Sequence, residues 1–158
     1  MQNLVTAIVE QLERQLETAI NASQDAHSSA THSENIADNK YDTLAVEAAY
    51  LAHGQSMRIS ELQETIHLYR NFQRPIFTQE SPVRLGALLE LENSVGQLQR
   101  VFIGPAAGGL KIGESPNTIT VVTRSTPLGR ALLDKYLDDE IELSINSRSE
   151  AFVILKIQ

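Results

Sequence analysis

The stretch that decides the fold is residues 119–143, which read ITVVTRSTPLGRALLDKYLDDEIEL. Its first five residues are all β-branched and three of them are apolar, which is typical of a strand. Thr126 offers a capping side chain and Pro127 stands at the first helical position, so we expect a short helix over residues 126–135. The run Ile141–Ile145 predicts a second strand. The stretch therefore predicts a small domain in which one short helix lies between two strands.

Short apolar runs bounded by turn residues continue on both sides of this stretch. Three more strands are expected, at Leu85–Glu92, Leu98–Ile103 and Ala151–Ile157. Gly and Pro gather between them, so residues 105–109 and 114–117 are expected to be loops. Five strands with one short helix predict an α+β domain with an antiparallel sheet.

The first half of the chain follows a helical period instead. Up to Phe72 it contains one Gly and no Pro, and its apolar residues recur every three or four positions. The first segment of this pattern consists of Val5, Val9, Leu12, Leu16 and Ala19. The second consists of Tyr41, Leu44, Ala48, Leu51, Gln55, Ile59, Leu62, Ile66 and Tyr69. Two such segments predict an antiparallel helical hairpin, a coiled-coil finger whose polar tip is expected at about residues 23–40.

The two halves meet near Arg74-Pro75, which predicts a hairpin at residues 1–74 and a sheet domain at residues 75–158. The chain of 158 residues has no Cys, which excludes disulfides, thiolate zinc sites and cysteine nucleophiles. Its net charge of −7 argues against autonomous binding to nucleic acid, whose phosphates need Lys and Arg. It contains no apolar run long enough to span a bilayer and no basic leader, so we expect a cytoplasmic protein.

A sheet domain that follows a helical hairpin and contains S-T-P-L-G-R-A-L-L-x-K-x-x-D-D-E, residues 125–140, resembles the Gre family of bacterial transcription elongation factors. That family shows a strand, then Ser-Pro, then a helix of the form A-R-A-L-x-G-K, then G-D-x-V. The last strand, Ala151–Ile157, also fits, so the resemblance covers roughly residues 80–158. In the first half, Ser33-Glu34-Asn35 is similar to the tip of the family's hairpin.

The resemblance implies an FKBP-like sheet domain that docks on the rim of the secondary channel of RNA polymerase, while the hairpin reaches inward. Carried over by motif, docking falls on Ser125, Thr126, Pro127 and Leu128. Carboxylates at the tip would help to hold a second Mg²⁺ at the polymerase active site, where backtracked RNA is hydrolysed. Glu34 matches the family's metal-binding Glu, and Asp38 is a second candidate nearby.

On this view the protein is not an enzyme and has no cofactor of its own. Mg²⁺ prefers oxygen ligands and keeps several waters, so it can be shared between the factor's carboxylates and the polymerase. RNA and DNA would be met only within the elongation complex, and neither a membrane nor a small-molecule substrate is expected.

The tip departs from the family pattern at one position. The family has an Asp three residues before the Glu, whereas this chain has Thr31, which cannot supply an anionic oxygen. Asp25, Asp38 and Asp42 are the acids close by. Three alternatives therefore stay open: a factor that stimulates RNA cleavage, a DksA-like regulator that occupies the channel without cleavage, and a peptidyl-prolyl isomerase or chaperone suggested by the FKBP-like sheet alone.

Overall fold

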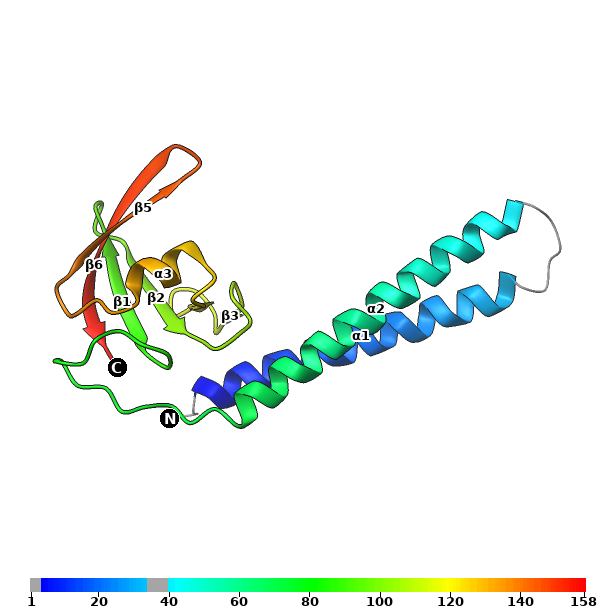
Figure 1. The fold of residues 1–158 in the computed structure, drawn as a ribbon, viewed down its shortest axis with the longest axis horizontal. Helices are drawn as coiled ribbons and strands as arrows, with labels where there is room; N and C mark the ends of the chain where they lie inside the picture. Colours follow the sequence, from blue (N-terminus) through cyan, green and yellow to red (C-terminus); the bar gives the residue numbers. More distant parts are fainter. Residues whose placement is uncertain (1–3, 34–39) are drawn as a thin grey trace. The chain divides into compact units, whose positions relative to one another are not determined.

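The computed structural model describes residues 4–33 and 40–158, and only the backbone of residues 29–33, 40–45 and 145. The chain divides into two compact units, Met1–Arg70 and Asn71–Gln158. The expected architecture is confirmed: a helical hairpin precedes a small sheet domain with one short helix (Figure 1). No helix in the described part of the chain is long and apolar enough to cross a membrane.

The hairpin consists of α1 (Leu4–Ser33) and α2 (Lys40–Arg70), which lie side by side in Figure 1. The structure differs from expectation at the tip, because α1 continues through the polar residues after Ala22. Serines and threonines there can satisfy their hydroxyls within the helix, and Ser28 Oγ donates to the Gln24 carbonyl at 3.0 Å. Ser33 is the last residue of α1.

The seam of the hairpin follows most of the predicted positions and is shifted by one residue at two of them. Ile8 is fully buried, whereas the expected Val9 is only half-buried. In α2, the expected Leu51 is 62% exposed, and Ala52 beside it is half-buried. The physical reason is that the predicted pattern steps by four and then three residues, whereas the observed one steps by three and then four. Both patterns repeat every seven residues, so both include the buried residues Val5, Leu12 and Ala19.

The sheet domain contains six strands in the order β3-β4-β2-β1-β6-β5. Their bounds are β1 Leu88–Asn93, β2 Leu98–Ile103, β3 Lys111–Ile112, β4 Ile119–Val122, β5 Glu140–Ile145 and β6 Arg148–Ile157. The sheet is mixed rather than wholly antiparallel, because β2 and β4 pair in parallel. The chain returns through β3 before it enters β4, and this crossover lets β4 run in the same direction as β2. Strand β3 was not predicted, since two residues show no periodicity.

The core of the domain lies on the face of the sheet that α3 (Pro127–Leu132) covers. Leu132 is fully buried there, together with alternate residues of the central strands such as Leu89, Leu91, Val101 and Ile154. α3 is shorter than predicted because Asp134, just beyond it, takes a left-handed φ of 63°. The Asp134 N–H then bonds to the Val83 carbonyl at 2.9 Å, which turns the chain out of the helix.

The segment near Arg74-Pro75, where the two halves meet, is attached to the sheet domain through Arg74. Its Nε donates to the Gly86 carbonyl and its Nη2 to the Gln158 carbonyl, each at 2.7 Å. The guanidinium lies 6.0 Å from the centre of the Phe102 ring, and burial lowers its pKa. Gly86 has a φ of +93°, and a Cβ there would lie 2.8 Å from Pro75 Cδ. Residues 72–75 are therefore part of the sheet domain, although the sequence placed the boundary after Arg74.

Candidate docking site

The four residues that the motif assigns to docking lie in the turn between β4 and α3, and one hydroxyl organises that turn. Thr126 Oγ1 accepts hydrogen bonds from the Thr123 N–H at 3.1 Å and from the Gly129 N–H at 3.2 Å. It donates to the Thr123 carbonyl at 2.8 Å. A hydroxyl has one proton and two lone pairs, so every hydrogen-bonding capacity of Thr126 is used. The expected capping role of Thr126, with Pro127 at the start of α3, is confirmed.

Close packing holds the turn in place from two sides. A Cβ on Gly129 would lie 2.0 Å from the Thr123 carbonyl oxygen, far inside van der Waals contact. A Cβ on Gly108 would lie 2.9 Å from Thr126 Cγ2, so the loop after β2 approaches Thr126 as closely as a glycine allows. Backbone bonds add to this, from the Thr126 N–H to the Thr123 carbonyl and from the Arg130 N–H to the Thr126 carbonyl, both at 3.0 Å. The turn therefore has one well-defined shape.

This geometry divides the four predicted residues into two pairs. Ser125 and Pro127 are exposed, while Thr126 and Leu128 are half-buried. Leu128 packs against the hydrophobic core, so it anchors α3. Ser125 and Pro127 are consequently the two that a partner can reach without disturbing the fold.

Positive charge surrounds the exposed pair. Arg124 precedes Ser125, Arg130 follows in α3, and both side chains are exposed. In a chain of net charge −7 this is a local reversal of sign. Such a surface favours a partner with acidic groups, because complementary charges speed association and fix orientation.

A shallow groove of about 650 Å³ lies beside Leu128, and the sequence did not reveal it. Its apolar part is formed by Leu128, Leu143 and Phe152, and its polar part by Gln99, Arg148 and Glu150. These residues come from α3, β2, β5 and β6, so only the fold brings them together. The alternation of apolar and polar residues in β5 was the one available signal.

The predicted tip residues cannot be placed in the same way. Glu34 and Asp38 lie outside the described residues. Asp42 lies in α2, where only its backbone is described, and Asp25 lies exposed in α1. Among the residues whose side chains are described, no group of His, Asp and Glu is arranged to hold a metal ion.

No protein-family model and no curated protein matches the chain. Solved structures similar to it include GreA factor homolog 1 (Gfh1) of Thermus thermophilus, at 21% identity and a TM-score of 0.41, over 95% of this chain and 94% of that one. Gfh1 of Thermus aquaticus has 22% identity and a TM-score of 0.42, over 97% and 95%. A structure described as the transcription factor Gfh1 has 22% identity and a TM-score of 0.41, over 95% of this chain and 92% of that one.

Proposed function

We propose that this chain is a transcription factor of the Gre type that binds RNA polymerase and acts on elongation. The turn at residues 123–129 carries the proposal. Its sequence is the part of the chain that most resembles the family, and its geometry exposes Ser125 and Pro127 at the positions where the resemblance puts the docking contact. The rigidity of the turn adds to the argument, because a preorganised contact loses little conformational freedom on binding.

The chain acts in this proposal as a cofactor of the polymerase rather than as an enzyme. The sheet domain docks on the rim of the secondary channel through Ser125, Pro127 and the adjacent groove. The hairpin enters the channel, and Glu34, with Asp38 as the second candidate, contributes to a Mg²⁺ that belongs to the polymerase active site. Carboxylate oxygens suit that ion, and the attack on RNA stays with the polymerase.

Docking is tested by competition for RNA polymerase. Replacing Pro127 with Ala is expected to weaken binding about tenfold, the usual scale for a central interface contact. Ile76→Ala is the matched control, because Ile76 is an apolar residue of the same domain that is 93% exposed, and its affinity is expected to be unchanged. Equal affinities of wild type and Pro127→Ala, with unfolding midpoints also equal, would remove the docking assignment.

A second candidate function keeps the docking and omits cleavage, and Thr31 favours it. A neutral hydroxyl stands where the family has a carboxylate, so the tip has lost one anionic ligand. The deciding assay uses a backtracked elongation complex with Mg²⁺. If the wild-type chain causes the RNA to shorten and Glu34→Ala does not, cleavage stimulation is supported. Intact RNA with displacement of an active Gre factor supports the second candidate, and Thr31→Asp is then expected to gain cleavage.

The isomerase or chaperone alternative is not favoured by the groove beside Leu128. Apolar pockets that hold a prolyl ring are rich in aromatic side chains, and Phe152 is the single aromatic residue in the described lining.

A further inference from the structure

The middle of the hairpin has a seam unlike that at its base. Near the base, large side chains such as Ile8, Leu12 and Tyr69 fill the space between the helices. Further along α1, the positions that face α2 are occupied by Gln15, Ala19 and Ala22, which are short or polar. Short side chains leave room, and a shallow groove of about 480 Å³ opens between α1 and α2.

The lining of this groove is rich in cationic and amide groups. It contains two guanidinium groups, Arg14 and Arg58, three carboxamides, Gln11, Gln15 and Gln55, and the hydroxyl of Thr18. No carboxylate is among the described lining residues, although residues 1–70 hold ten Asp and Glu against four Lys and Arg. The groove is therefore a positively charged, donor-rich site on an acidic finger.

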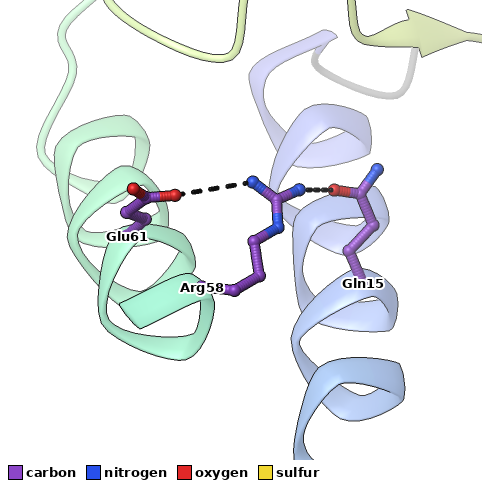
Figure 2. Close-up of polar contacts among 3 residues, drawn as sticks. All are labelled: Gln15, Arg58 and Glu61. Carbon is purple, nitrogen blue, oxygen red and sulfur yellow. Dashed lines mark hydrogen bonds and ion pairs between the residues drawn. The ribbon is translucent and has the colours of Figure 1, made fainter. Parts of the chain in front are cut away.

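The hydrogen-bond partners of the two arginines are mainly the neutral side-chain oxygens of glutamines. Arg58 reaches from α2 to α1, where its Nη2 donates to Gln15 Oε1 at 3.3 Å (Figure 2). Its other partner is Glu61, whose carboxylate lies 3.8 Å from Nη1, with both side chains more than half exposed. Arg14 donates through Nε and Nη2 to Gln11 Oε1, at 3.1 and 2.6 Å.

These partners are weak compared with an oxyanion. An exposed ion pair at this distance contributes little, and a hydrogen bond to a neutral amide is weaker than one between two charged groups. Arginine also presents a planar fork that matches two phosphate oxygens at once. A phosphate group in the groove would therefore replace poor partners with better ones, while the amide groups of the glutamines supply further donors.

We propose that this groove binds a small anion with a di- or triphosphate group. Its volume lies in the range of about 300–1,000 Å³ that is usual for small-molecule sites. A long nucleic acid is the less suitable occupant, because its backbone would continue past the exposed acids Glu17 and Glu61. A small anion meets fewer of these acids than a long chain does: Glu61 lies 3.8 Å from Arg58 Nη1, but charges further away than about 8 Å are largely screened at physiological salt. The proposal is independent of polymerase binding.

The test uses the full chain, labelled with ¹⁵N, and pyrophosphate as the probe. The side-chain amide resonances of Gln11, Gln15 and Gln55 are expected to shift in a saturable manner. The variant R14Q/R58Q is expected to bind at least tenfold more weakly, because each charge-assisted hydrogen bond is worth roughly a factor of ten. The control R84Q/K111Q removes two exposed cationic side chains of the sheet domain, outside the docking turn, and is expected to bind pyrophosphate as wild type does.

Three results would overturn the proposal. One is the absence of saturable shifts, and another is equal affinity of wild type and R14Q/R58Q. The third is a single-stranded RNA heptamer that binds the groove more tightly than pyrophosphate, since the site would then be for nucleic acid. If R14Q/R58Q loses helical circular dichroism, R14K/R58K decides: this variant keeps the charge but not the fork, and unchanged affinity would contradict the role of the guanidinium groups.

Discussion

At the scale of single residues, the Thr126 hydroxyl holds the turn between β4 and α3 in shape. It closes the turn through three hydrogen bonds and caps α3, while Ser125 and Pro127 on either side of Thr126 are exposed. The sequence alone indicated the cap, because Thr before Pro at a helix start has a known physical meaning. It could not show which neighbours were exposed, since that depends on how α3 lies on the core.

The stability of the sheet domain should respond to the Thr126 hydroxyl in particular. Thr126→Val keeps the shape of the side chain and is expected to lower the free energy of unfolding by about 1–2 kcal/mol, because it removes the cap and leaves buried backbone groups without partners. Thr126→Ser keeps the hydroxyl and should cost clearly less. Urea unfolding monitored on the sheet domain measures both, and equal losses would mean that the methyl group, not the hydroxyl, holds the turn.

Gly129 and Gly54 form a second comparison at this scale. A Cβ on Gly129 would overlap the Thr123 carbonyl, so Gly129→Ala is expected to destabilise the sheet domain by about 1–3 kcal/mol. Gly54 lies within α2 with nothing within 4 Å of an added Cβ, so Gly54→Ala should stabilise the hairpin by about 0.5–1 kcal/mol. Thermal unfolding of the two variants beside wild type should show shifts of opposite sign.

At the scale of elements, the sequence determined where helices and strands lie better than how they face one another. Strand β2 begins and ends as predicted, at Leu98 and Ile103, because a short segment rich in apolar residues is bounded there by turn signals. Most seam positions of the hairpin were predicted correctly, but Ile8 and Ala52 take the places expected for Val9 and Leu51, because adjacent apolar residues give no preference between two patterns of spacing. The parallel pairing of β2 with β4 was missed, since direction follows from the crossover through β3 rather than from any local signal.

The corrected seam predicts a difference between two adjacent residues. Ile8→Ala is expected to lower the stability of the hairpin by about 2–4 kcal/mol, because it leaves a cavity between the helices. Val9→Ala, at a half-buried position, should cost less than about 1 kcal/mol. The loss of helical circular dichroism on heating provides the measurement. A larger loss of stability for Val9→Ala than for Ile8→Ala would mean that Val9 faces α2, as the sequence predicted.

At the scale of the whole molecule, each of the two units contains its own buried core, so they should unfold separately. The second unit begins at Asn71, and the Arg74 contacts lie within it. A fragment of residues 71–158 is expected to unfold cooperatively, and a fragment of residues 75–158 should be less stable by about 1–3 kcal/mol, the worth of hydrogen bonds from a charged group. Denaturant unfolding of both fragments tests this, and equal stability of the two fragments would mean that the sheet domain begins at Pro75.

The change of seam along the hairpin also has a mechanical consequence. Large interlocked side chains at the base resist sliding and bending, whereas the alanines and glutamines further out share little surface between the helices. The bending stiffness of such a finger falls with distance from its base, like that of a tapered rod. A force on the free end would bend the outer half of the hairpin, whereas the two helices at the base would keep their positions relative to each other.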